Sequence, residues 1–403
     1  MTDALSTTCL IAGGGPAGIM CGYLLARAGT DVIVLEKHRD FFRDFRGDTI
    51  HPSTLQVMDE LGLLEDFLAL PHQEVRHAEG ELGDTRIRLA DFTHLPTRCK
   101  FIAFLPQWDF LNFLALKARA FPNFRLLMET EAAGLLRERG RVCGLMTKSP
   151  EGEFAIRARL AIAADGRHSA VREAAGLRVR NLGAPMDVLW FKLAFREGDA
   201  PAVFGRIAEG AVLVRLYRGD YWQCALIIRK GTFDEVQRQG LDAFRARVAA
   251  LARRDTADEI ASWDDVRLLT VAVDRLGRWW QPGLLFIGDA AHAMSPIGGV
   301  GINLAIQDAV AAANILAAPL RRGALTDDDL ARVEKRRRFP TWATQKMQTT
   351  VQNRVIDPLL SSGRTPAVPG FVKLAQRWTW LQRIPARVIG MGFRPEHVGR
   401  DLL

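Results

Sequence analysis

The first forty residues alternate between short apolar runs and a helical apolar period. Residues 9–12 and 32–35 are continuous apolar runs, and between them Ile19, Tyr23 and Leu24 recur at the spacing of one helix face. Uninterrupted apolar runs are typical of parallel strands buried on both faces, and the intervening period is typical of the helix that connects them. This segment therefore predicts a strand, helix, strand unit in a parallel sheet.

A glycine motif lies where the first predicted strand meets the helix. Gly13-Gly-Gly15-Pro-Ala-Gly18 has the GxGxxG spacing, and Glu36 follows the second strand, 23 residues after Gly13. In this context the first glycine makes a tight turn, the second lets the backbone approach a pyrophosphate, and the third lets helix and strand pack closely. Pro16 suits the first helical turn, and Glu36 is placed to accept hydrogen bonds from a ribose. The unit predicts a dinucleotide site, but NAD and FAD share the motif.

Two later apolar runs each end in a carboxylate. Residues 160–164 lead into Asp165-Gly166, and residues 284–287 lead into Gly288-Asp289. Open α/β sheets bind ligands at the carboxyl ends of their strands. We therefore expect both carboxylates at the same ligand.

A glycine-rich loop, residues 296–301, follows the second carboxylate and precedes a helix expected from about residue 302 to about residue 318. This helix is apolar almost all round, with Asn303, Asp308 and Asn314 as polar exceptions. Such a helix is buried, and its positive N-terminal end would face whatever lies in the loop.

The order and spacing of these three motifs resemble the class A flavin-dependent monooxygenases, the family of 4-hydroxybenzoate hydroxylase and phenol hydroxylase. Weaker matches lie at Arg46-Gly47-Asp48 and at Leu105-Pro-Gln107. The resemblance implies an α/β fold with an FAD-binding, Rossmann-like domain of the glutathione-reductase type, an inserted β-sheet substrate domain and a helical C-terminal segment. The residues that it assigns to FAD are Gly13, Gly15, Pro16, Ala17, Gly18, Glu36, Lys37, Arg46, Gln107, Asp165, Gly166, Asp289, Gly299, Gly301, Ile302 and Asn303.

The resemblance also implies roles for some of these residues. Asp289 would bind the ribityl chain of FAD, and the backbone at Gly301 and Ile302 would face N1 and O2 of the flavin. Arg46 and Gln107 match positions that contact the FAD phosphates and the ribityl chain. Asp165-Gly166 is tied to the binding of both FAD and NAD(P)H.

The implied reaction is hydroxylation of a phenolic or similarly electron-rich ring. NAD(P)H reduces FAD, O₂ adds at flavin C4a, and the resulting hydroperoxide delivers the hydroxyl group. The chain has only one GxGxxG, so we expect NADPH or NADH to dock transiently instead of occupying a second nucleotide-binding domain.

The catalytic residue is not identified by these motifs, and three residues are candidates for the pocket. His51 lies near the expected flavin and could accept a phenolic proton. Pro296 could shape the chamber over the flavin, and Tyr217 could hold a substrate hydroxyl. The plainer interpretations are a hydrogen-bonded structural histidine, a turn proline and a tyrosine of the sheet core.

The motifs predict a domain organisation in which separated segments combine. Strand-like stretches at 186–195, 211–217 and 221–228, with Gly219-Asp220 as a hairpin turn, predict the substrate sheet. Residues 233–254 read as one helix. The expected ranges are 1–75, 101–178 and 268–345 for the FAD-binding domain, 76–100 and 179–267 for the substrate-binding sheet, and 346–403 for the C-terminal helical segment.

Composition and charge exclude several classes of protein. The chain has 54 basic and 46 acidic residues, and residues 321–403 hold 16 basic and 7 acidic ones, so the excess of positive charge belongs to the C-terminal fifth. We expect its arginines, including Arg336-Arg-Arg338, to solvate a helix face. No nucleic-acid-binding motif and no metal-ligand spacing occurs, and five unpaired cysteines indicate the cytoplasm. A homodimer is left open.

Two alternatives to an aromatic hydroxylase remain at this point. One is a flavoprotein that acts on an isoprenoid or quinone lipid at a membrane surface through the basic C-terminal segment, where Phe371, Leu374, Trp378 and Leu381 fall at helical spacing. We expect that stripe to pack against the flavin domain. The other is a flavin-dependent halogenase, whose WxWxIP signature resembles residues 378–385, except that three residues separate the second tryptophan from the isoleucine.

Overall fold

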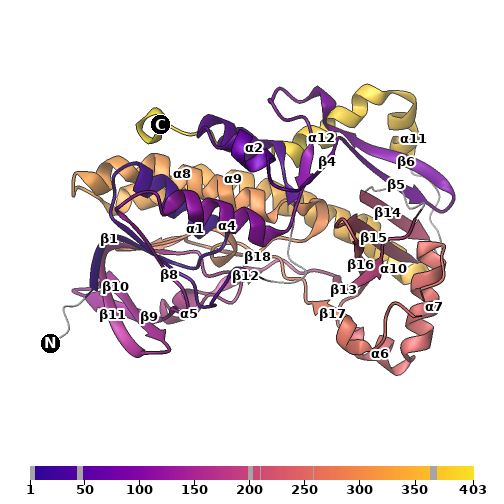
Figure 1. The fold of residues 1–403 in the computed structure, drawn as a ribbon, viewed down its shortest axis with the longest axis horizontal. Helices are drawn as coiled ribbons and strands as arrows, with labels where there is room; N and C mark the ends of the chain where they lie inside the picture. The colour runs from indigo at the N-terminus through magenta and orange to yellow at the C-terminus, as the bar shows by residue number, and fades with distance from the viewer. Residues whose placement is uncertain (1–4, 43–48, 198–202, 209, 257, 364–369) are drawn as a thin grey trace.

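The computed structural model describes residues 5–42, 49–197, 203–208, 210–256, 258–363 and 370–403. Its two large sheets lie at opposite ends of the molecule, and long helices run along the first sheet toward the second (Figure 1). The C-terminal helices α11 (Gly370–Arg377) and α12 (Arg383–Gly390) lie above β5 (His77–Leu82), β6 (Thr85–Asp91) and the end of this helical layer.

The first sheet contains the predicted parallel unit. Its strand order is β19-β20-β11-β1-β2-β8, with the β9–β10 hairpin added on β11. The central strand β1 pairs in parallel with β2 on one side and with β11 on the other. The bounds are β1 (Leu5–Ala12), β2 (Val32–Leu35), β8 (Phe124–Leu127), β9 (Glu131–Glu138), β10 (Arg141–Ser149), β11 (Gly152–Ala163), β19 (Trp280–Gln281) and β20 (Leu284–Phe286).

Four helices cover one face of this sheet. Their apolar side chains form one core with alternate residues of the strands, among them Ile11, Val34 and Ile162. The bounds are α1 (Pro16–Arg27), α4 (Gln107–Ala118), α8 (Gly301–Arg321) and α9 (Asp327–Val351). By length and composition the segment Ile297–Arg321 could cross a membrane, but 78% of its most apolar window is buried inside the protein, as in a core helix.

The second sheet is mostly antiparallel, in the order β17-β13-β16-β15-β14-β5-β6. The predicted hairpin is confirmed, because β15 and β16 pair across Gly219-Asp220. Residues 77–91 join this sheet, since β5 pairs with β14. The bounds are β5 (His77–Leu82), β6 (Thr85–Asp91), β13 (Met186–Ala194), β14 (Val203–Ala208), β15 (Ala211–Tyr217), β16 (Tyr221–Arg229) and β17 (Arg267–Leu269).

Three boundaries differ from those expected. The segment 233–254, predicted as one helix, forms two helices, α6 (Phe233–Arg238) and α7 (Leu241–Ala252). Gly240 lies between them with φ of +94°, a conformation that a continuous helix does not contain. Strand β17 begins at Arg267 and belongs to the second sheet, so the return to the first sheet comes later than residue 268. The boundary expected at 345/346 lies inside α9, which continues to Val351.

Smaller elements connect the two sheets and form the C-terminal segment. A three-stranded sheet joins β3, β7 and β4, and β12 pairs with β18. After α9 the chain makes a π-helical turn at Gln352–Ile356. The remaining bounds are β3 (Thr49–Ile50), β4 (Gln73–Val75), β7 (Ile102–Phe104), β12 (Val179–Asn181), β18 (Asp274–Leu276), α2 (Pro52–Glu60), α3 (Leu64–Leu68), α5 (Ala170–Ala174), α10 (Asp357–Ser362), α11 (Gly370–Arg377) and α12 (Arg383–Gly390).

Candidate active site

The three glycines of the first motif have two different structural roles. A β-carbon on Gly13 would lie 2.4 Å from the carbonyl oxygen of Ala164, and one on Gly18 would lie 1.9 Å from that of Gly13. No described atom lies within 4 Å of the position that a β-carbon on Gly15 would take. Gly13 and Gly18 are therefore required by the fold, whereas Gly15 leaves space outside it.

The start of α1 is shaped to receive an anion. Pro16 occupies its first turn, and no side chain among the described residues caps its free N–H groups. Ala17 is buried, and its β-carbon lies 3.1 Å from the position of a β-carbon on Gly288 in the third motif. Exposed N–H groups and the helix dipole favour a phosphate at this point.

Glu36 lies at the carboxyl end of β2 and is held beside the glycine turn. Its Oε2 accepts a hydrogen bond from the Gly14 N–H at 3.2 Å, and its Oε1 accepts one from the His38 N–H at 3.1 Å. Lys37 lies beside it, exposed, with its Nζ 3.7 Å from the Glu131 carboxylate. The Glu36 carboxylate is thus oriented along the ligand side of the turn.

The second and third motifs, far apart in sequence, meet as expected. Strands β11 and β20 pair in parallel, with Ala163 opposite Phe286, so both motifs leave the same edge of the sheet. Arg167 Nη2 lies 3.7 Å from Asp289 Oδ2, and Arg172 Nη1 donates to the Ala290 carbonyl at 2.9 Å.

Asp165 is a buried carboxylate with one oxygen satisfied. Its Oδ2 accepts a hydrogen bond from the Val171 N–H at 3.1 Å, while its buried Oδ1 has no hydrogen-bond partner among the described residues. Burial raises the pKa of this carboxyl above its ordinary value. Gly166 follows with φ of +87°, which turns the chain away from the strand. The free oxygen is an acceptor for a ligand donor, such as a ribose hydroxyl.

Asn303 connects the start of α8 to the β3–α2 segment. Its Oδ1 accepts hydrogen bonds from the His51 N–H and the Thr54 hydroxyl, both at 2.8 Å, and its Nδ2 donates to the Thr49 carbonyl at 3.0 Å and weakly to that of Gly299. The side chain therefore has a positioning role. The backbone of Gly301 and Ile302 lies at the N-terminus of α8, which no described side chain caps.

His51 is fully buried directly before α2. Its Nδ1 lies 2.8 Å from the Ile389 carbonyl, so Nδ1 carries the proton, and Nε2 is an acceptor without a partner in the described structure. Burial lowers its pKa to about 4. The ring is neutral at physiological pH, and its Nε2 can act only as a hydrogen-bond acceptor.

For two other residues expected to contact FAD, Gln107 and Arg46, the structure gives less information about their place in the site. Gln107 begins α4 and is half-buried, close along the chain to β7, which pairs with β3. Arg46 lies outside the described residues, which omit 43–48.

Comparison with known proteins assigns the family. Residues 6–347 match the family described as FAD binding domain. The chain belongs to this family. 6-Methylpretetramide 4-monooxygenase of Streptomyces rimosus is 34% identical to it over 407 residues, which cover 99% of this chain and 96% of that protein. Para-nitrophenol 4-monooxygenase of Pseudomonas sp. (strain WBC-3) is 27% identical, with 79% of each chain covered.

Solved structures agree on the fold. OxyS anhydrotetracycline hydroxylase from Streptomyces rimosus superposes with a TM-score of 0.76 at 24% identity, covering 96% of this chain and 76% of that one. The probable FAD-dependent monooxygenase pqsL from Pseudomonas aeruginosa superposes with a TM-score of 0.74 at 22% identity, covering 89% of this chain and 99% of that one. These structures confirm the predicted fold, and the family match and the two relatives confirm the FAD cofactor and the monooxygenase class.

In this FAD-dependent monooxygenase, one face of the second sheet points toward the flavin domain. Met186 and Val212 on that face pack with Ile297 from the glycine loop, and Trp190 and Val214 pack with Phe104 and Ile389. Alternate residues point the other way, toward α7.

Tyr217 belongs to the other face. It packs against Phe195 and Trp222, with ring centroids 4.5 and 5.7 Å away, within the cluster that faces α7. This packing favours the plainer interpretation, a tyrosine of the sheet core, and the role of Tyr217 in holding a substrate hydroxyl stays an untested prediction. Sequence periodicity assigns residues to two faces but does not say which face meets the flavin domain.

Pro296 lies in a loop that α9 and the π-helical turn hold by three buried glutamines. Gln345 Nε2 donates to the Ala293 carbonyl at 3.1 Å, and Gln348 exchanges hydrogen bonds with Ser295 N–H and C=O at 3.2 and 2.8 Å. Gln352 Nε2 donates to the Ser295 hydroxyl at 3.0 Å. Sequence analysis missed these residues, although their spacing of three and four along one helix face was a detectable signal.

A buried ionic network lies beneath the Gly288-Asp289 motif. Asp308 accepts hydrogen bonds from the Gly288 N–H at 3.0 Å, from His292 Nε2 at 2.6 Å and from Arg337 Nε at 2.9 Å, and Arg337 also reaches Glu396 at 3.1 Å. Arg337 was expected on a solvated face and is instead 1% exposed. Among the described residues, no group of three His, Cys, Asp or Glu could hold a metal ion.

Proposed function

We propose that this protein is a hydroxylase for a large phenolic substrate of the aromatic polyketide type, with FAD as cofactor and NAD(P)H and O₂ as co-substrates. The observation that carries the proposal is the 34% identity to 6-methylpretetramide 4-monooxygenase, which extends over 99% of this chain. A match of this extent includes the substrate sheet and the C-terminal segment as well as the cofactor domain, and function depends on such sites more than on the shared fold.

The residues around the first sheet fit FAD. The open space at Gly15 and the uncapped start of α1 suit the pyrophosphate, and Glu36 suits the ribose. Asp165 Oδ1, an orphaned buried acceptor, and Asp289 at the adjacent strand end suit hydroxyl groups of the cofactor. When bound, FAD supplies hydride acceptance from the nicotinamide and activation of O₂.

The chain supplies electrostatic stabilisation and exclusion of water. The free N–H groups at the start of α8 would stabilise negative charge on the flavin ring edge, since preorganised donors are a large catalytic contribution. Asn303 fixes these N–H groups through its hydrogen bonds to the β3–α2 segment. The glutamine-held loop at Pro296 would close the chamber against water.

The flavin-facing side of the second sheet would bind the ring system. Ala225 of β16 pairs with Trp190 of β13 and Val214 of β15, and this small side chain packs in one cluster with both of them. Gln223 lies two residues before Ala225 on β16 and is buried. Its Oε1 accepts a hydrogen bond from Arg218 Nε at 3.0 Å, while its Nε2 has no hydrogen-bond partner in the described structure. This amide would donate to a substrate oxygen, and His51 Nε2 would accept a hydrogen bond from a phenolic hydroxyl.

The test is oxidation of NADPH by the purified yellow protein under air, with a panel of single-ring and fused-ring phenols. We expect fused-ring phenols to accelerate NADPH consumption and to gain one oxygen atom from ¹⁸O₂. Failure of every phenol to do either would refute the proposal. A halide-dependent product formed with a separate flavin reductase would instead indicate a halogenase.

Two variants test the assigned face of the sheet. Ala225→Phe places a large side chain between Trp190 and Val214 and is expected to raise KM for the fused-ring substrate at least tenfold without loss of FAD. Tyr217→Phe, on the other face, is expected to leave KM within twofold. The reverse result would place the substrate on the α7 side.

Three further expectations belong with this proposal. A cytoplasmic location fits the cysteines, which are all free. The choice between NADPH and NADH follows from the same assay run with each. A homodimer is tested by sedimentation velocity.

A further inference from the structure

The C-terminal segment exposes an unusual number of apolar side chains. Of the twelve large apolar residues that are exposed in the described structure, six lie within residues 346–403. Leu374, Trp378, Trp380 and Ile384 on or beside α11 and α12 are between 43% and 56% exposed. Leu374 and Trp378 were expected to pack against the flavin domain, and the structure places them at the surface instead.

The part of this segment between Asp357 and Glu396 carries only positive charge. Between Asp357 and Glu396 the chain has six basic residues and no acidic one. Arg383, Arg387 and Arg394 line a groove of about 610 Å³ together with Trp380, Ile384 and Phe393. The surface therefore offers guanidinium groups directly beside aromatic and aliphatic side chains.

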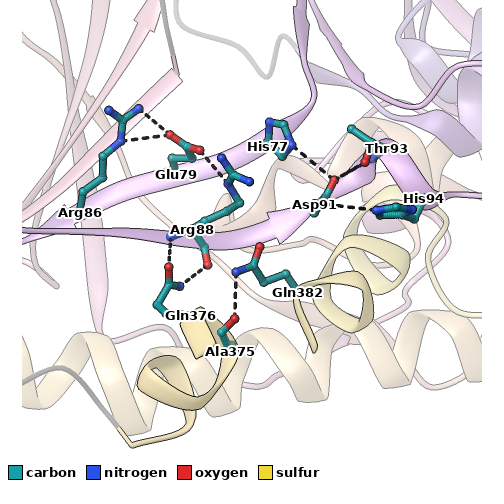
Figure 2. A network of polar contacts seen from close by, with 10 residues as sticks. All are labelled: His77, Glu79, Arg86, Arg88, Asp91, Thr93, His94, Ala375, Gln376 and Gln382. Atoms are coloured by element: carbon teal, nitrogen blue, oxygen red, sulfur yellow. Dashed lines mark hydrogen bonds and ion pairs between the residues drawn. The ribbon is translucent and has the colours of Figure 1, made fainter. Parts of the chain in front are cut away.

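Polar contacts hold this surface to the second sheet. Gln376 of α11 donates from Nε2 to the Arg88 carbonyl at 2.7 Å and accepts from the Arg88 N–H at 3.3 Å, so it completes the edge of β6 (Figure 2). Gln382 Nε2 donates to the Ala375 carbonyl at 2.9 Å and joins α11 to the turn before α12. Because side-chain amides anchor α11 and this turn, their apolar side chains remain available at the surface.

The contacts of β6 continue toward α12. Asp91 accepts hydrogen bonds from the Thr93 N–H and hydroxyl and lies 3.5 and 3.6 Å from His77 and His94 (Figure 2). His94 Nε2 in turn lies 3.3 Å from Arg383 at the start of α12. These contacts fix the inner side of α12 and place Ile384 and Arg387 on its outer side.

Helix α12 therefore has two different faces. Ala386 and Ile389 pack in the cluster that contains Phe104 and Trp190, on the substrate side of the sheet. Ile384 and Arg387 face outward and line the groove. A single helix thus separates the exposed basic and apolar surface from the proposed substrate region.

We propose that the surface of residues 374–394 docks on an anionic phospholipid bilayer. Short amphipathic helices that combine tryptophan and aliphatic residues with arginine lie at the headgroup level of membranes. The four arginines of this surface, without an intervening acid, complement an anionic leaflet, which attracts each basic residue near it. The exposed apolar side chains enter the headgroup region while the flavin domain stays outside.

Docking would place the proposed substrate sheet next to the bilayer. A phenolic substrate with a large apolar ring system partitions into lipid, and only α12 would separate it from the face that contains Trp190. This consequence rests on the proposed function, whereas lipid binding itself is measured without substrate or turnover.

The test is flotation of the FAD-loaded enzyme with vesicles of phosphatidylcholine and phosphatidylglycerol at 3:1, compared with pure phosphatidylcholine. We expect binding to the anionic vesicles, with weakening as salt rises. Arg383→Gln combined with Arg387→Gln should lower the partition coefficient roughly 25-fold, about fivefold for each charge removed. Trp380→Ser combined with Ile384→Ser should lower it at least tenfold.

Matched controls carry the same changes elsewhere on the surface. Leu116→Ser on α4 removes a side chain that is 67% exposed, and Arg238→Gln removes an exposed charge on α6. The partition coefficient of both controls onto anionic vesicles should stay within twofold of that of the parent protein. All variants should retain FAD and the unfolding temperature of the parent protein.

Three results would overturn the proposal. They are no binding to anionic vesicles at 50 mM salt, equal loss of binding in the control variants, and a concentration-dependent dimer that Trp380→Ser with Ile384→Ser abolishes. The last result would assign the surface to a second copy of the chain. Lipid binding without phenol hydroxylation would refute the proposed function alone.

Discussion

Replacement of Arg337 by Met should destabilise the protein far more than the same replacement five residues earlier on α9. Arg337 is 1% exposed and is bonded to Asp308 at 2.9 Å and Glu396 at 3.1 Å. Its removal leaves two buried carboxylates without their shared cation. Breaking a buried ion pair from one side costs about 3–5 kcal/mol, and we expect a loss of that size in the free energy of unfolding.

Arg332→Met is the matched control. Arg332 is exposed and lies 3.1 Å from Asp329 on the same helix, and a surface pair of this kind contributes about 0–1 kcal/mol. Unfolding in urea, followed by tryptophan fluorescence in the FAD-loaded protein, measures both losses. Equal losses in the two variants would refute the reasoning.

A double variant separates loss of the ion pair from loss of packing. Asp308→Asn with Arg337→Met removes the charge on both sides, so its loss should be smaller than the sum of the single losses. Although burial by itself raises the pKa of Asp308, the charges and hydrogen bonds of His292 and Arg337 hold it below its ordinary value. The contribution of Asp308 to stability is therefore present above the unfolded pKa and is lost only as pH falls through the lower folded value.

Three further predictions follow from individual contacts. Gly15→Ala should leave the unfolding temperature of the apoprotein unchanged but weaken FAD binding at least tenfold, whereas Gly18→Ala should destabilise the fold itself, which thermal unfolding and flavin titration distinguish. Because the folded pKa of His51 is about 4 and the unfolded one about 6.5, stability should fall by about 3 kcal/mol between pH 6.5 and 4, and His51→Gln should remove this dependence in urea titrations at each pH. Gln348→Ala frees the Ser295 backbone and should increase the fraction of NADPH oxidation that yields hydrogen peroxide, measured by a peroxidase-coupled assay; unchanged coupling would contradict its positioning role.

The cofactor motifs could be predicted because their signals are local. The turn at Gly13, the strand ends at Asp165 and Asp289, and the helix after Gly301 each depend on residues within a few positions of one another. Their meeting at one edge of the sheet follows from parallel pairing, which the apolar runs already indicate. For the same reason the hairpin at Gly219-Asp220 was predictable from its turn residues.

The substrate side could not be predicted to the same depth. A strand pattern with period two divides β15 into two sets, and nothing in the sequence says that Val214 faces the flavin domain while Tyr217 faces α7. The helix expected over 233–254 failed at Gly240, where a left-handed glycine interrupts an otherwise continuous helical pattern. Exposure of Trp378 and Ile384 depends on how amide groups anchor α11 and the turn before α12, and sequence periodicity does not report such contacts.

The polar residues of α8 show how far the sequence alone predicts the packing of this helix. Asn303, Asp308 and Asn314 were visible as exceptions in an apolar helix; Asn303 and Asp308 are buried, and buried polar groups require partners. Each partner arrives from a distant segment: Thr49 and His51 bond to Asn303, Arg337 bonds to Asp308, and residues 397–399 bond to Asn314. The two buried polar side chains thus require other segments to dock on this helix, and only the fold identifies those segments. Because two of the segments that bond to this helix are α9 and the chain end beyond α12, the C-terminal fifth is part of the flavin domain's core as well as its basic surface.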